Sequence, residues 1–72
     1  MVRDSGLEGT VQFCGEPQFA KGVWVGVELD TEAGKNDGEV KGVRYFQCPP
    51  NHGLFCKPDK LQKVQKQMVR IL

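Results

Sequence analysis

A glycine-flanked loop carries the side chains best suited to binding chemistry, the run Gly34-Lys35-Asn36-Asp37-Gly38, called the glycine loop below. Glycine-rich backbone can expose N–H groups, the Lys35 ammonium adds a positive charge, and the Asn36 amide is both donor and acceptor. Together these groups could hold a carboxylate. The same residues also make an ordinary turn, because Asn, Asp and Gly tolerate positive φ. The run alone does not decide between a turn and an anion site.

Aromatic and basic side chains elsewhere could complete such a site. In the segment 23–30, Trp24 falls on the polar face of an alternating pattern. An aromatic ring there must be covered by a loop, packed at an edge, or line a surface groove. Phe55 and Lys57 share one face of the segment 53–57. In a domain this small, however, most aromatic rings are expected to serve packing.

Short strands must position these residues. Nine glycines and four prolines in 72 residues divide the chain into short pieces, which favours an all-β fold, a small barrel with many turns. Alternation and turn residues predict strands over 9–13, 23–30, 40–47, 53–57 and 61–64.

The alternation also assigns side chains to faces. Val11 and Phe13 are expected on one face of the first strand. In the second strand, the core face is expected to carry Val23, Val25, Val27 and Leu29.

The chain is predicted to be one domain, residues 1–64, followed by a basic tail or linker over 65–72. The three-four spacing of Leu61, Val64, Met68 and Ile71 could also begin an amphipathic helix. Residues 57–72 carry five basic side chains against one acidic, whereas residues 1–56 carry five against eight. The basic end could be a solvated face or could steer the domain toward an acidic partner.

Composition narrows the function classes. The net charge of +1 argues against a strong nucleic-acid or membrane binder, and no apolar run reaches the roughly 20 residues of a membrane span. Three cysteines without a CxxC pair suit a reducing, cytosolic setting better than disulfides or a zinc site. His52 is expected to be a solvated loop residue. A hydrolase could be assembled on paper from Cys48 or Cys56 with His52 and Asp59, but no oxyanion element accompanies them. No enzyme activity, metal or cofactor is therefore expected.

The segments around the glycine loop help to decide what this loop does. Together with that loop, the chain resembles a CAP-Gly domain of the cytoplasmic linker protein and dynactin large subunit type, in order and over about positions 6–64. The segments that carry the resemblance are Gly9-Thr10-Val11, Gly15, Phe19 to Asp30, Gly42 to Cys48, Gly53-Leu54-Phe55 and Pro58 to Leu61.

The resemblance implies an SH3-like barrel of twisted antiparallel strands, in which the glycine loop forms one wall of a groove. That groove would bind acidic C-terminal tails ending in Glu-Glu-Tyr/Phe, as on α-tubulin and end-binding proteins. Carried over by position, its lining would be Phe19, Trp24, Lys35, Asn36, Phe55 and Lys57. Gly34, Asp37 and Gly38 would support the loop, and Phe46 and Lys60 are secondary candidates.

Two positions depart from the family pattern. Relatives begin with a Val-x-Val-x-Gly strand, and residues 1–8 are too short or too altered to show it, so the first strand is expected to be truncated. Lys57 stands where relatives often place an arginine. It keeps the charge but lacks the planar fork that grips a carboxylate in two places.

The expected function is a non-catalytic module that links its parent protein to microtubules in the cytoplasm. One alternative is a tubulin-folding or dimer-handling cofactor module. Another is a small barrel that binds RNA or proline-rich peptides, which the acidic balance of residues 1–56 opposes.

Overall fold

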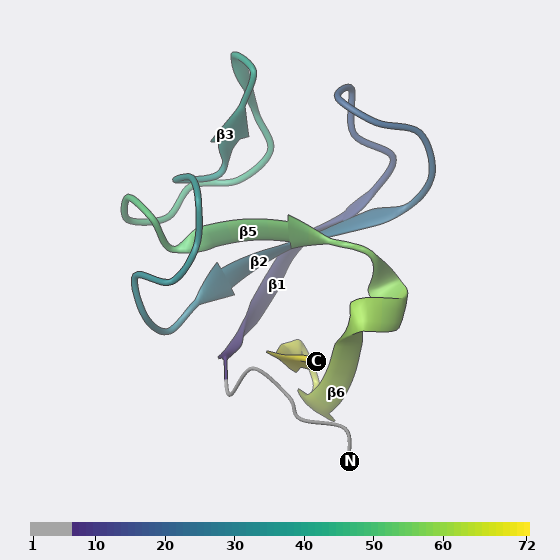
Figure 1. Ribbon diagram of the computed structural model, residues 1–72, viewed down its shortest axis with the longest axis vertical. Helices are drawn as coiled ribbons and strands as arrows, with labels where there is room; N and C mark the ends of the chain where they lie inside the picture. The colour runs from purple at the N-terminus through teal and green to yellow at the C-terminus, as the bar shows by residue number, and fades with distance from the viewer. Residues whose placement is uncertain (1–6) are drawn as a thin grey trace.

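The computed structural model describes residues 7–72 as an all-β fold, and these residues form no α-helix (Figure 1). The strands are β1 (Glu8–Gly15), β2 (Trp24–Leu29), β3 (Glu39–Val40), β4 (Val43–Arg44), β5 (Gly53–Cys56), β6 (Leu61–Gln65) and β7 (Met68–Ile71). One 3₁₀ turn, Pro58–Lys60, joins β5 to β6. The expectation of a small antiparallel β domain is confirmed.

Five strands form one antiparallel sheet in the order β5-β2-β1-β7-β6, while β3 and β4 form a separate hairpin. In Figure 1 the loop between β1 and β2 and the β3 hairpin extend from the same side of the sheet. β2 lies between β1 and β5, so its side chains meet neighbours on both sides. This central strand divides the molecule into two faces.

One face of the sheet carries a closed aliphatic core, made of Val25, Val27, Leu29, Val69 and Ile71. Val27 is 0% and Leu29 1% exposed. The core positions predicted at residues 25, 27 and 29 are confirmed. Val23 is a correction, because it precedes β2 and is 51% exposed.

A bulge in β1 overturns the predicted facing of Val11 and Phe13. Val11 pairs with Val27, whereas Phe13 pairs with Gly26, so one extra residue lies between two consecutive pairs. The extra residue reverses the alternation, as bulges do. Val11 therefore packs against the aliphatic core, while Phe13 joins the opposite face.

The strand predicted over 40–47 is a hairpin instead. Val40 pairs with Val43, which leaves Lys41 and Gly42 as a two-residue turn. Both residues have positive φ, 52° and 81°. Such angles define the tight turns that match the twist of a hairpin. Tyr45 and Phe46 lie beyond β4 and are free to turn toward the sheet.

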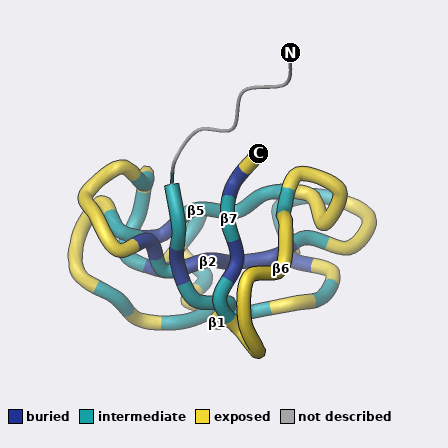
Figure 2. The backbone as a smooth tube through the Cα atoms, turned by 90° about the horizontal axis from the view of Figure 1, so that it is seen from below, coloured by how far each residue is buried: buried dark blue, intermediate teal, exposed yellow. Residues whose placement is uncertain are grey.

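The basic tail expected over 65–72 is also corrected. Residues 61–71 form the β6–β7 hairpin, and β7 pairs with β1. Val69 and Ile71 belong to the aliphatic core, so burial of these side chains holds β7 in the sheet. Figure 2 shows β6 largely exposed beside the partly buried β7. The expectation of a truncated first strand falls mainly on residues 1–6, outside the described residues.

Candidate functional site

The face of β2 opposite the aliphatic core carries an aromatic layer. Gly26 permits it, because a Cβ there would lie 2.6 Å from Phe46 Cε1 and 3.1 Å from Phe55 Cε2. Phe55 lies at the centre, with ring centroids 5.2 Å from Phe19 and 5.3 Å from Tyr45. The members of the layer are Phe13, Phe19, Trp24, Tyr45, Phe46 and Phe55. Every one of these residues remains partly accessible to solvent.

Trp24 joins the aromatic layer to a positive charge. Its ring lies 5.8 Å from that of Phe19 in an edge-to-face arrangement. Lys57 Nζ lies 5.0 Å from the Trp24 ring centroid, within the range of a cation–π contact. The Trp24 Nε1–H donates to the Lys21 carbonyl at 3.2 Å, which fixes the indole plane. The structure thus brings together four of the six predicted groove residues.

The glycine loop contributes the other two predicted groove residues. It runs beside the start of β5, where Asn36 and Gly53 form an isolated antiparallel bridge. Gly53 N–H donates to the Asn36 carbonyl at 2.7 Å, and the Gly53 carbonyl accepts from Lys35 N–H at 2.8 Å. Lys35 itself is exposed and Asn36 is half-buried.

The backbone of the glycine loop is not the open anion cradle that its glycines suggested. The Gly34 N–H donates to the Asn51 carbonyl, and the Lys35 and Asn36 N–H groups both donate to the Gly53 carbonyl. The Gly38 N–H donates to Asn36 Oδ1 at 2.9 Å. These four donors are satisfied inside the protein. Of Lys35 and Asn36, the side chains rather than the N–H groups are therefore left to meet an incoming carboxylate.

Two glycines have a steric role at this place. Gly38 has φ 101°, and a Cβ there would overlap the Phe46 carbonyl oxygen. A Cβ on Gly53 would overlap Asn36 Oδ1. Close approach of backbone to backbone is a position that only glycine fills. The predicted supporting role of Gly38 therefore has a physical cause.

Arg44, which the sequence did not single out, ties the glycine loop to the β3–β4 hairpin. Its Nη1 donates to the carbonyls of Asp37 at 3.2 Å and Phe46 at 3.0 Å. Its Nη2 forms ion pairs with Asp37 at 3.4 Å and Glu39 at 3.2 Å. A hydrogen bond from the Glu39 N–H, with the Arg44 charge, lowers the pKa of Asp37. Opposite charges at Glu39 and Arg44, which pair across the hairpin, were the available signal.

The secondary candidates occupy different places. Phe46 packs on Phe55 in the aromatic layer, with centroids 5.7 Å apart. Lys60 is exposed in the 3₁₀ turn, where its carbonyl accepts from the Leu72 N–H at 2.8 Å. Phe46 therefore lies with the predicted groove residues, whereas Lys60 lies where β5 passes into β6.

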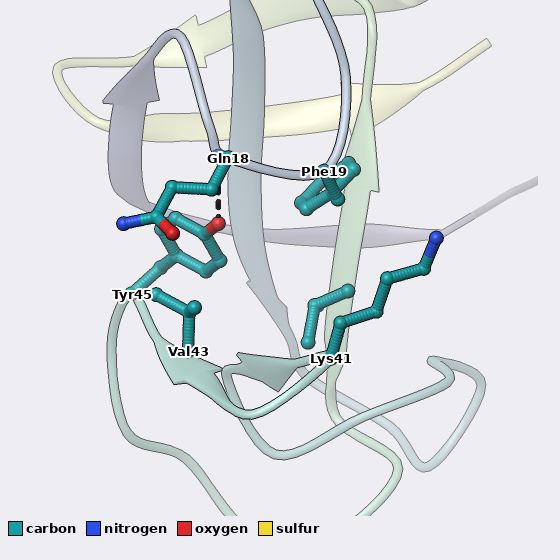
Figure 3. Close-up of a pocket in the computed structure, with 6 residues that line it drawn as sticks. Gln18, Phe19, Lys41, Val43 and Tyr45 are labelled. Atoms are coloured by element: carbon teal, nitrogen blue, oxygen red, sulfur yellow. Dashed lines mark hydrogen bonds between the residues drawn. The ribbon is translucent and has the colours of Figure 1, made fainter.

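A hollow of about 150 Å³ lies beside the aromatic layer, lined by Gln18, Phe19, Val40, Lys41, Val43 and Tyr45. Figure 3 shows Phe19 across the hollow from the β3–β4 hairpin, with Tyr45 at one end. Tyr45 Oη accepts a hydrogen bond from the Gln18 N–H at 2.8 Å. Phe19 is the one predicted groove residue in this lining. In the sequence, the only indication of this hollow was the pair of valines that flank Lys41-Gly42.

The thiols of Cys48 and Cys56 are not activated as nucleophiles. Burial raises the pKa of the Cys56 thiol and, with nearby Glu28 and Asp37, that of Cys48. Both thiols are thus poorer nucleophiles at neutral pH. His52 is half-buried rather than solvated, with Nδ1 2.7 Å from the Leu29 carbonyl, so that nitrogen carries the proton.

Residues 7–72 contain neither a metal-binding cluster nor a membrane-spanning helix. No group of three or more His, Cys, Asp or Glu side chains is placed to hold a metal ion. Within the same residues, no helix has the length and apolar character needed to cross a membrane.

The chain is similar in sequence to several known proteins. Human CAP-Gly domain-containing linker protein 3 is 58% identical over 63 residues, which cover 88% of this chain and 12% of that protein. Tubulin-specific chaperone B of Dictyostelium discoideum is 60% identical over 50 residues, 69% of this chain and 18% of that protein. This chain thus spans only a small part of these relatives.

A solved structure agrees with the sequence relatives. The solution structure of the CAP-Gly domain in human Kinesin-like protein KIF13B matches with a TM-score of 0.72 at 35% identity, over 90% of this chain and 72% of that one. The model of the CAP-Gly domain family matches residues 1–61. Since that match covers most of the chain and includes the glycine loop, the chain belongs to the CAP-Gly domain family.

Proposed function

We propose that this domain is a non-catalytic binding module that captures acidic C-terminal tails ending in Glu-Glu-Tyr/Phe and so links its parent protein to microtubules. The observation that carries the proposal is the placement of Lys35 and Asn36 on a braced loop that reaches the same β5 strand as the aromatic layer. Membership of the CAP-Gly family and a relative whose name includes tubulin support it. The proposed partners are tubulin and end-binding proteins in the cytoplasm, and the proposal includes no nucleic acid.

The terminal carboxylate is the group that the glycine loop would recognise. Asn36 Oδ1 already accepts from the Gly38 N–H, so the amide NH₂ is the part of this side chain left to donate. The exposed Lys35 ammonium supplies the charge. A charge-assisted hydrogen bond to a carboxylate is stronger than a neutral one. A chain end would therefore be preferred over an internal acidic segment.

The aromatic layer and Lys57 would hold the rest of the tail. Phe19, Trp24 and Phe55 present partly exposed rings on which a terminal Tyr or Phe ring can pack. Lys57, held over Trp24, places a cation beside these rings for the preceding glutamates. Rim charges of this kind mainly raise association rates, whereas buried ring contacts set the residence time.

Titration of a peptide ending in Glu-Glu-Tyr, against the same peptide with an amidated end, tests the proposal. We expect amidation to lower affinity by at least tenfold, since about 1.4 kcal/mol corresponds to a factor of ten and a charged hydrogen bond contributes that much. Equal affinity for the two peptides would rule out carboxylate capture.

Variants of the glycine loop sharpen the same test. Lys35→Ala should weaken binding of the free-ended peptide and leave the unfolding temperature unchanged, because Lys35 is exposed. Asn36→Asp keeps an oxygen for the Gly38 N–H but removes the NH₂ donor and adds a repelling charge. It should abolish binding with little loss of stability. Lys63→Ala, an exposed lysine of β6, is the matched control.

A role in handling free tubulin is the second candidate, favoured by the 60% identity to Tubulin-specific chaperone B. The two roles share the binding site and differ in the form of tubulin bound by the parent protein. Pelleting of the full-length parent with microtubules, compared with its co-elution with tubulin dimers, separates them.

A further inference from the structure

We propose that the hollow between the β1–β2 loop and the β3–β4 hairpin is a second subsite, which takes one apolar side chain of the bound tail upstream of its C-terminal residue. The inference rests on the proposed function, because it assigns a further contact to the same acidic partner. It adds a determinant of specificity that lies apart from the glycine loop.

The size and lining of the hollow suit a single ring. Its volume is about 150 Å³, and a cavity of roughly 150 Å³ with apolar walls is large enough for benzene. Phe19 forms one wall, and Val43 lies opposite it on the hairpin (Figure 3). Val40, which pairs with Val43 in the hairpin, also lines the hollow. Gln18, Lys41 and Tyr45 complete the lining, so the hollow offers apolar walls with polar groups beside them. An apolar side chain packed between Phe19 and the valines would remove apolar surface of both partners from water, which is favourable.

Lys41 gives the hollow a positive rim. It occupies the first position of the two-residue turn at φ 52°, where Asn, Asp or Gly is usual. Figure 3 shows its side chain extending outward from the hairpin, on the side away from Tyr45. At this position, lysine is less favourable for the backbone than asparagine, but it adds a positive charge. That charge complements glutamates next to the inserted side chain.

The hollow is continuous with the proposed tail-binding site. Phe19 lines the hollow and also contacts the rings of Trp24, at 5.8 Å, and Phe55, at 5.2 Å. Tyr45, at one end of the hollow, has its ring centroid 5.3 Å from that of Phe55. Its hydroxyl oxygen accepts from the Gln18 N–H, which leaves the hydroxyl proton for a peptide carbonyl. A tail held at the glycine loop could therefore continue over Phe19 into the hollow.

A series of acidic peptides tests this subsite on the protein as it exists. All have equal length and end in Glu-Glu-Tyr; each carries one phenylalanine at a different upstream position, and the reference peptide carries alanine throughout. We expect one position, or two adjacent ones, to raise affinity about tenfold, the effect of partly burying one ring. The other positions should change affinity by less than about twofold.

Variants of the hairpin then locate the gain. Val43→Phe fills the hollow from within, so it should remove the gain and leave affinity for the reference peptide unchanged. If its unfolding temperature falls, Val43→Ala replaces it and should reduce the gain to about threefold, because the wall recedes. Lys41→Asn suits the turn and removes the charge, so it should weaken the best peptide about threefold without loss of stability. Lys63→Asn on β6 is the control.

The outcomes separate this inference from the proposed function. If the reference peptide binds through its free end but no phenylalanine position gains affinity, the subsite is wrong and the proposed function stands. If no peptide binds, free or amidated, both fall. A stable Val43→Phe protein that loses the reference peptide would place the terminal ring in the hollow and overturn the upstream assignment. A gain that survives both Val43 variants would overturn it as well.

Discussion

The two faces of β2 are buried to very different extents. On one face, Val25, Val27 and Leu29 are 6%, 0% and 1% exposed, and β7 contributes Val69 and Ile71 to the same core. On the other face, the rings of the aromatic layer touch one another edge to face, yet none of these residues is fully buried. One strand therefore supplies a closed core on one side and a partly exposed aromatic surface on the other.

This difference divides the consequences of mutation. Side chains of the closed face lose contacts on all sides when truncated, so their loss is expected to lower stability. Rings of the open face keep part of their surface in water, which preserves apolar area for a partner. Substitutions on the closed face should therefore change folding first, and substitutions on the open face should change binding first.

The largest expected effect comes from the strand that closes the aliphatic core. Removal of residues 66–72 takes away β7, with Val69 and Ile71, and exposes one edge of β1. We expect the shortened chain to lose its cooperative unfolding transition in circular dichroism. In the intact chain, Ile71→Ala should lower the free energy of unfolding by about 2–4 kcal/mol. Val64→Ala, at a side chain 42% exposed, is the control and should have little effect. A shortened chain as stable as the intact one would show that β7 is dispensable.

Two glycines with positive φ give a matched pair of intermediate effect. Gly38 has φ 101°, and a Cβ added there would overlap the Phe46 carbonyl. Gly42 has φ 81°, and a Cβ added there would meet no atom within 4 Å outside its chain neighbours. Gly42→Ala should cost about 1 kcal/mol from backbone strain alone. Gly38→Ala should cost more, about 2–4 kcal/mol, because the loop must also move. Equal melting temperatures for the two variants would contradict the steric role assigned to Gly38.

The sequence predicted the closed face better than the open one. Strict alternation in 23–30 placed Val25, Val27 and Leu29 correctly, because a strand buried on one face repeats every second residue. It failed at Phe13, since a bulge adds one residue without any mark in the pattern. It also failed at β7, whose apolar residues fit helical spacing as well as a strand. Pairing with β1, which lies near the other end of the chain, decided in favour of a strand.

The resemblance named the residues of the candidate site but not the hydrogen bonds within its loop. Sequence resemblance named the glycine loop, and the structure places Lys35 and Asn36 at the start of β5. Nothing in the sequence indicated that backbone N–H groups of the glycine loop already donate to oxygens of Asn51, Gly53 and Asn36. Long-range hydrogen bonds depend on which strands become neighbours, and single-residue types carry no record of them. The same reason explains why Arg44 and the hollow were missed.

A loop aromatic should affect binding more than folding. Phe19 packs at the margin of the aromatic layer and is half-buried. Phe19→Ala should lower stability by about 1–2 kcal/mol, because its ring loses three edge-to-face contacts but already keeps part of its surface in water. It should lower affinity for a Glu-Glu-Tyr peptide by more than tenfold, measured by calorimetry. Leu54→Ala, on the aliphatic side of β5, is the paired control and should lower stability more than affinity. A reversed order would show that the open face serves packing alone.

The smallest expected effect concerns acid stability near the glycine loop. The Glu39 N–H and Arg44 hold the pKa of Asp37 below its ordinary 3.8 in the folded protein. A carboxyl with a depressed folded-state pKa contributes stability above its unfolded pKa and loses it as pH falls through the folded value. We therefore expect the difference in melting temperature between the wild type and Asp37→Asn to be constant near neutral pH and to shrink below about pH 4. The wild type should be the more stable protein at neutral pH.

Because Asp37 is largely solvent-exposed, the difference should be small and should weaken further in high salt. Glu32→Gln, at an exposed acidic residue of the β2–β3 loop, is the control. A difference that grows as the pH falls would show that Asp37 is not stabilised in its charged form.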